Sequence, residues 1–194
     1  SIGNLQPVLN SYWLMIHVAV IVGSYGPFAL GMILGLISLL LMLLTTAKNK
    51  EKMALNVKEL TVINEMALTV GLVMLTIGNF LGGMWANESW GRYWGWDPKE
   101  TWALISIMIY AFVIHMRLVP GLRNRLVFNI ASVLAFGSIL MTYFGVNFYL
   151  AGLHSYAKDD QEISINYILT ALAIITTLSF LAYLKYRKFY TKSN

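Results

Sequence analysis

Five long apolar segments are the feature that most constrains the fold of this chain of 194 residues. A helix of about 20 apolar residues matches the thickness of the hydrocarbon layer of a membrane. The segments that we interpret as membrane-spanning helices are Tyr12–Thr46, Leu60–Met84, Thr101–Met116, Leu126–Phe148 and Ile163–Leu184. The sequence therefore predicts an all-α integral membrane protein with about five transmembrane helices, forming a single polytopic membrane domain over residues 1–194.

Composition supports this class. Hydrophobic residues make up 58% of the chain and charged residues only 12%, and the mean hydropathy is +0.64. A soluble domain carries about 25% charged residues. This balance excludes a soluble enzyme, a disordered tail and a collagen-like chain. The chain has no cysteine, so it can form neither a disulfide nor a thiolate metal site from its own residues.

The first segment is too long for one crossing of the bilayer, and Gly26-Pro27 inside it predicts a kink. No signal peptide is expected before this segment, because the N-terminus lacks a charged region and a cleavage site.

The charges of the connecting segments predict the orientation. One set of connections carries eleven of the 14 basic residues: Lys48, Lys50, Lys52, Lys58, Arg117, Arg123, Arg125, Lys185, Arg187, Lys188 and Lys192. Basic connections remain on the cytoplasmic side of a membrane. We therefore predict an N-terminus outside and a cytoplasmic C-terminus. The net charge of +5 then reports topology, and nucleic acid is excluded as a partner.

An aromatic segment lies on the predicted outer side. Residues 85–102 contain five of the six tryptophans together with a tyrosine: Trp85, Trp90, Tyr93, Trp94, Trp96 and Trp102. One interpretation is an aromatic belt at the membrane interface. The alternative is an extracytoplasmic loop that forms a flat aromatic platform for a large planar apolar ligand.

A helix start follows within the same segment. Asp97 is predicted to be the N-cap, Pro98 the first helical residue and Glu100 the third. A carboxylate that caps a helix is already engaged, which argues against Asp97 and Glu100 as an acid–base pair for hydrolysis.

Two of the three histidines fall on the predicted outer side. Counting about 25 residues back from Thr46 places the outer edge of the hydrocarbon near Gly23, so His17 lies roughly 8–10 Å outside it. His154 follows the outer end of the fourth segment. Histidines are common at interfaces. Two of them flanking an aromatic segment also suggest axial ligands for a metal-bearing planar ring, which is haem.

His115 lies near the opposite side, some 22 Å deeper than the aromatic segment. It is either a functional intramembrane residue or a side chain that reaches the inner interface. Glu65 lies at a similar depth, where it could pair with His115 or form an ordinary salt bridge.

Three motifs carry a resemblance to a known family. They are the tryptophan-rich stretch Trp90–Trp102, the first-helix motif Trp13–His17 and the later motif Gly152–Tyr156. With them the chain resembles the cytochrome c-type biogenesis proteins of the CcsA/ResC family, the haem handling proteins with the tryptophan-rich WWD signature. It resembles the C-terminal core of a longer or fused protein of that family.

The resemblance implies haem b as the bound group, with His17 and His154 as axial ligands of the haem iron and His115 in an inner membrane haem site. It also implies that the aromatic segment holds the ring, through Trp85, Trp90, Tyr93, Trp94, Trp96, Asp97 and Trp102. No residue is assigned a catalytic role.

The function implied is presentation of haem for thioether attachment to apocytochrome c, which supplies a Cys-x-x-Cys-His motif. Such a chain would also move haem across the membrane and act within a holocytochrome c synthase beside a CcsB/ResB-type partner. It would lie in the cytoplasmic membrane, with its haem site facing the periplasm or cell exterior. Two alternatives stay open: a haem delivery module without ligase activity that serves a chaperone, and a haem-independent transporter or scaffold.

Overall fold

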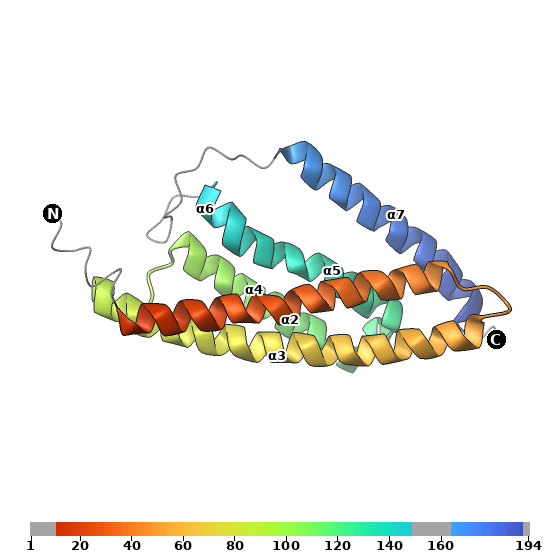
Figure 1. Ribbon diagram of the computed structural model, residues 1–194, viewed down its shortest axis with the longest axis horizontal. Helices are drawn as coiled ribbons and strands as arrows, with labels where there is room; N and C mark the ends of the chain where they lie inside the picture. The colour runs from red at the N-terminus through yellow and green to blue at the C-terminus, as the bar shows by residue number, and fades with distance from the viewer. Residues whose placement is uncertain (1–10, 149–163, 192–194) are drawn as a thin grey trace.

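The computed structural model describes residues 11–148 and 164–191. Within these ranges, five helices are long and apolar enough to cross a membrane, which confirms the predicted fold class. Figure 1 shows them as one elongated bundle.

A long antiparallel pair forms one side of the bundle. Helix α2 covers Tyr12–Leu43 and helix α3 covers Lys50–Trp90 (Figure 1). At 1.5 Å per residue they are about 48 and 62 Å long, whereas the hydrocarbon layer is about 30 Å thick. Both helices are therefore longer than the hydrocarbon layer is thick. The sequence predicts this excess length for the segment that forms α2 but not for the one that forms α3.

Helix α3 is longer at both ends than its apolar run. It starts at Lys50, where Glu51 lies in the first turn, and it ends at Gly91, whose left-handed backbone (φ 72°) donates its N–H to Asn87 O. Hydropathy does not mark the charged turns before Leu60, although they consist mostly of good helix formers.

The extension changes the aromatic segment, which was predicted as a loop. Trp85 and Trp90 belong to α3, and Trp102 belongs to α4, which covers Pro98–His115. Only the connection 91–97 is not helical.

The remaining elements are shorter. They are the 3₁₀ turns η2 (Met116–Leu118) and η3 (Pro120–Leu122), α5 (Arg125–Leu140), the π-helical turn η4 (Met141–Gly145), α6 (Val146–Phe148) and α7 (Ile165–Phe189). Pro27 lies inside α2, which continues as one helix on both sides of it.

Glycines let α2 and α3 approach each other closely. A Cβ atom at Gly71 would lie 2.7 Å from Phe28 Cε1, and one at Gly78 would lie 2.6 Å from Ile21 Cγ1. Small residues at such positions are typical of helix pairs in membranes, because association there depends on van der Waals packing. Ser11 Oγ also donates to Glu88 Oε2 at 2.9 Å, which joins the start of α2 to the end of α3.

Buried amides link α3 to α5 inside the bundle. Asn64 Nδ2 donates to Ser132 Oγ at 3.0 Å, and Asn129 Nδ2 donates to Thr61 Oγ1 at 3.0 Å. Asn64, Asn129 and Ser132 are fully buried. Hydrogen bonds of this kind between membrane helices contribute about 0.6 kcal/mol each on average.

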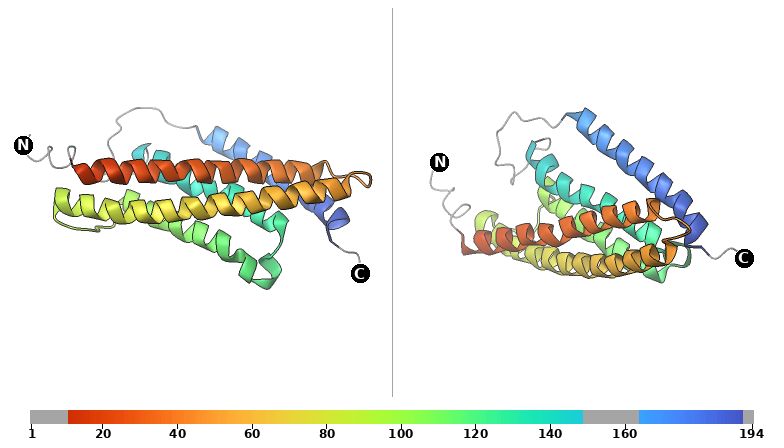
Figure 2. Two further views of the ribbon diagram at one scale, coloured as in Figure 1. Left: turned by 60° about the horizontal axis from the view of Figure 1, so that its bottom comes forward. Right: turned by 45° about the vertical axis from the view of Figure 1, so that its right-hand side comes forward.

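The C-terminal end of helix α7 packs against the bundle, whereas the N-terminal end of α7 lies apart from the other helices (Figures 1 and 2). Lys185 Nζ donates to Thr45 O at 3.0 Å, and Tyr190 hydrogen-bonds Thr45 through their hydroxyl groups. Ala182 is the one fully buried residue among the described residues of α7.

The two ends of the bundle differ in charge. The α2–α3 turn, the segment 116–124 and the end of α7 lie toward one end, with most of the described basic residues. Arg92 and Lys99 lie at the other end. The predicted orientation depends on this unequal distribution of basic residues between the two ends of the bundle.

We predict that Gly71→Ala lowers the free energy of unfolding by about 1–3 kcal/mol, because the added methyl group meets the buried Phe28 ring. Gly137→Ala is the matched control, since a Cβ atom at this helical glycine would have no neighbour within 4 Å. Thermal unfolding in detergent measures both. Equal unfolding midpoints for the two variants would contradict the prediction and show that the Phe28 ring accommodates the methyl group without loss of stability.

Candidate functional site

A cavity of about 250 Å³ lies where α2 begins, α3 ends and α4 begins. Five elements contribute to its wall: α2, α3, the connection 91–97, α4 and η4. Ligand pockets in proteins typically enclose about 300–1,000 Å³. A large planar ligand would therefore fit within this cavity only in part.

His17 lies on the cavity wall with a defined environment. Its Nδ1 lies 3.0 Å from Gly78 O, and its ring stacks on Trp85 with centroids 5.6 Å apart and planes 17° apart. A carbonyl oxygen only accepts, so Nδ1 carries the proton. In the neutral ring Nε2 is then the nitrogen with the lone pair, which is the state of a metal-ligating histidine.

Gly82 makes room for this imidazole. A Cβ atom there would lie 2.7 Å from both Cε1 and Nδ1 of His17. The face of α3 that packs on α2 therefore continues into the site, from Gly71 and Gly78 to Gly82 and Trp85.

The aromatic residues surround the cavity at several angles. Trp85, which is 1% exposed, lines it together with Tyr93 and Trp94. Trp94 meets Trp96 edge to face at 90°, and Trp85 meets Trp90 at 62°. The rings therefore do not form the flat platform that the sequence suggests. Trp85, Tyr93 and Trp94 form part of the wall, and Trp90 and Trp96 contact that wall without lining the cavity.

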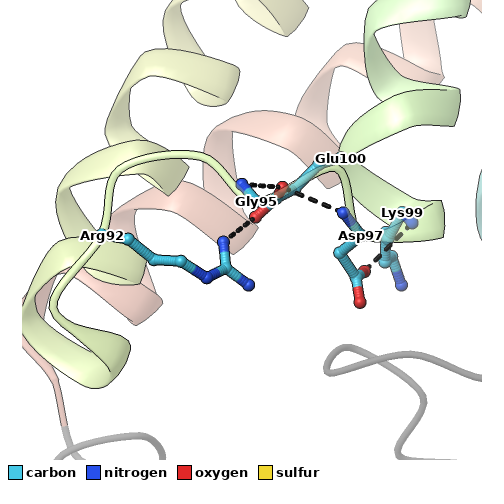
Figure 3. A network of polar contacts seen from close by, with 5 residues as sticks. All are labelled: Arg92, Gly95, Asp97, Lys99 and Glu100. Carbon is cyan, nitrogen blue, oxygen red and sulfur yellow. Dashed lines mark hydrogen bonds and ion pairs between the residues drawn. The ribbon is translucent and has the colours of Figure 1, made fainter.

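Glu100 holds the connection 91–97 in place (Figure 3). Its Oε2 accepts from the backbone N–H groups of Gly95 at 2.8 Å and Asp97 at 3.2 Å, and its Oε1 accepts from Arg92 Nη1 at 3.3 Å. The Asp97 side chain accepts from the backbone N–H groups of Lys99 and Glu100, and with the bond from Asp97 N–H to Glu100 this makes the predicted cap of α4 a capping box.

Trp96 lies between two of these hydrogen bonds and has a left-handed backbone with φ of 59°. It is the only residue other than glycine with a positive φ in the described part of the chain. Such a backbone costs about 1–3 kcal/mol and persists where its surroundings hold it. The Glu100 carboxylate supplies this restraint on both sides and leaves the indole 68% exposed.

The cavity wall also includes residues that the sequence does not predict as site residues. Thr142 and Tyr143 come from the π-helical turn η4, and Lys99 comes from the first turn of α4. Turns of this kind are frequent at functional sites. No compositional signal marks η4, whereas the helical spacing of Gly78, Gly82 and Trp85 could have indicated the α3 side of the wall.

His115 lies away from this cavity. It is the last residue of α4, is exposed, and its Nδ1 lies 2.6 Å from Ala111 O of its own helix. Glu65 forms its ion pair with Arg117 at 2.5 Å. The ordinary salt bridge is therefore the role that the structure gives Glu65.

The other predicted site residues are distributed as follows. Trp90, Trp96, Asp97 and Trp102 do not line the cavity, and His154 lies outside the described residues. In ranges 11–148 and 164–191, no three His, Asp or Glu side chains gather as they would around a bare metal ion. A haem iron is held mainly by the four ring nitrogens and needs only axial ligands from the protein.

Together these features define a polytopic helical membrane protein with a histidine-bearing aromatic cavity at one end. The chain matches the family described as "Cytochrome C assembly protein" over residues 1–154 and belongs to it.

Its relatives include two kinds of protein. It is 56% identical to "Protein NrfI" of Wolinella succinogenes over 162 residues, which is 82% of this chain and 18% of the relative. It is 40% identical to "Cytochrome c biogenesis protein CcsA" of Chlamydomonas reinhardtii over 153 residues, covering 78% of this chain and 42% of that protein. It is 35% identical to "Cytochrome c biogenesis protein CcsA" of Prochlorococcus marinus strain MIT 9301, over 80% of this chain and 57% of that protein. The chain thus spans less than two thirds of each of these relatives.

We predict that Glu100→Ala releases the connection 91–97, because it removes the acceptor of two backbone N–H groups and of Arg92. Unsatisfied buried donors cost about 1–3 kcal/mol each. Hydrogen exchange of the Gly95 and Asp97 amides should become faster, while Glu100→Gln, which keeps one oxygen, should have a smaller effect. The exposed Glu59→Ala is the control, and unchanged protection in Glu100→Ala would contradict this role.

Proposed function

We propose that this chain binds haem b in the cavity at the outer end of the bundle and presents it for covalent attachment to apocytochrome c. The observation that carries the proposal is the state of His17. Its Nδ1–H is directed to a backbone carbonyl, its ring stacks on Trp85, and it lies on the wall of an aromatic cavity. Histidine ligands of haem and other metals are commonly oriented by such a second hydrogen bond.

The chemistry of the wall fits a porphyrin. The ring is large, flat and apolar, and the wall offers Trp85, Trp94 and Tyr93 for burial and stacking. The cavity is smaller than such a ligand, so part of the haem would extend beyond it. The exposed Trp96 lies beside Trp94, with the two rings at 90° to each other, which suits it to cover a ligand that emerges there.

His154 is proposed as the second axial ligand of the same iron. Two neutral imidazoles favour a six-coordinate, low-spin haem that is retained until it is used. The proposal for this residue depends on the sequence motif Gly152–Tyr156 and on the family membership.

Attachment needs no nucleophile from this chain. Each thioether forms when a cysteine thiol of the apocytochrome adds across a haem vinyl group, so that sulfur bonds to one vinyl carbon and a hydrogen to the other. The chain has no cysteine and would contribute position, axial ligation and exclusion of water. The names of the relatives, which describe CcsA as a cytochrome c biogenesis protein, agree with this role.

We further propose that His115 belongs to an inner haem site from which haem moves to the outer one, in a complex with a CcsB/ResB-type membrane protein. Its Nδ1 bonds Ala111 O, so the neutral ring again has its lone pair on Nε2, and the side chain is exposed at the helix end. An exposed imidazole at this depth is available to a ligand shared with a second protein.

The proposed location is the cytoplasmic membrane, with the cavity toward the periplasm or cell exterior. Because the chain has no cysteine, single cysteines can report this orientation. We predict that a membrane-impermeant maleimide labels Glu88→Cys in intact cells and labels Lys52→Cys only after permeabilisation. Both residues are exposed and lie near opposite ends of α3. The reverse pattern would overturn the orientation.

We predict that His17→Ala lowers the haem content of the purified protein severalfold and converts the remaining haem from low spin to high spin. Gly82→Ala should act in the same direction, because the new methyl group displaces the imidazole. Absorption spectra at equal protein concentration measure both effects.

Gly137→Ala is the control, since this helical glycine does not line the cavity and its Cβ atom would have no neighbour within 4 Å. Free imidazole in the buffer should restore the low-spin spectrum of His17→Ala. If His17→Ala keeps full haem content and an unchanged low-spin spectrum, His17 is not a ligand.

A further inference from the structure

Lys99 places a cation on the wall of the cavity that His17 lines. It is the second residue of α4, and its Nζ donates to Asn147 Oδ1 at 3.4 Å and lies 5.9 Å from the centroid of the Tyr143 ring. The direct side-chain contacts of its ammonium group are therefore an amide and an aromatic ring.

No carboxylate forms an ion pair with Lys99 in the described part of the chain, where the ion pairs are Arg92–Glu100 and Arg117–Glu65. Asp97 is close in sequence, but its Oδ2 accepts from the backbone N–H of Lys99. Glu100 is engaged by Arg92 and by the connection 91–97.

This position is unfavourable for a cation that no carboxylate contacts as an ion pair. The start of a helix carries partial positive charge, and a half-buried ammonium group in an apolar wall loses hydration. Charged residues kept at such positions in membrane proteins commonly face a ligand or its pathway. An anionic group entering the cavity would relieve both penalties.

We infer that Lys99 binds a carboxylate of the cavity's ligand, which, given the proposed haem binding, is a haem propionate. The two propionates are the only anionic substituents of an otherwise apolar ring, and a charge-assisted hydrogen bond to one of them is about twice as strong as a neutral one. The vinyl groups lie on the edge of haem opposite the propionates. Anchoring the propionate edge at α4 would leave the vinyl edge facing away from Lys99, toward an incoming thiol.

The test compares two ligands, haem and haem dimethyl ester, whose propionates are neutral. Dissociation constants are measured by absorption titration of the detergent-solubilised chain. The wild-type chain should bind haem roughly tenfold to a hundredfold more tightly than the ester, because a hydrogen bond to a charged group is lost.

Lys99→Met, which keeps an unbranched side chain one atom shorter and removes the charge, should bind the two ligands with equal affinity, whereas Lys99→Arg should keep most of the preference. Lys58→Met removes the same charge from an exposed position toward the other end of α3 and should keep the full wild-type preference. A loss that came only from damaged structure would weaken both ligands alike and leave their ratio unchanged.

The outcomes separate this inference from the proposed function. If the wild-type chain binds neither ligand, the proposed haem binding fails, and the role of Lys99 fails with it. If haem binds but Lys99→Met keeps the preference for haem over the ester, or if the wild type shows no preference, the role of Lys99 alone is overturned.

Discussion

The close packing of α2 against α3 determines where the residues of the candidate site lie. Glycines at positions 71, 78 and 82 remove side chains from the face of α3 that meets α2, so the two backbones approach along the pair. The same approach brings His17 onto Trp85 and gives its Nδ1 a carbonyl acceptor at Gly78. One contact surface therefore both stabilises the bundle and fixes the tautomer of the proposed ligand.

The rest of the site depends on how the chain leaves this pair. Gly91 ends α3, and Asp97 starts α4 within a few residues, so the intervening connection is short and folds back over the cavity. Glu100 holds it with hydrogen bonds on both sides of the left-handed Trp96. Because this carboxylate is occupied in the wall, it positions the aromatic residues, and Lys99 is the cation of the wall that we infer binds the ligand.

The sequence predicts the membrane-spanning helices and the start of α4, but it does not predict the full length of α3 or the contacts between helices. The five apolar runs and the Asp97 cap have strong local signals, and both are present. The charged first turns of α3 lack a hydropathy signal, so its length was underestimated. Contacts across helices, such as that of Gly82 with His17, depend on which faces meet, and the π-helical turn that carries Tyr143 has no local signature.

The central claim is that haem occupies the aromatic cavity at the end of the bundle where α2 begins. The most direct test is a cryo-electron microscopy map of the haem-loaded protein. Haem bound as we propose would give planar density between His17 and Trp94, with the iron at His17 Nε2 and a carboxylate at Lys99. A map with the cavity empty and haem bound only elsewhere, for example beside His115, would contradict it.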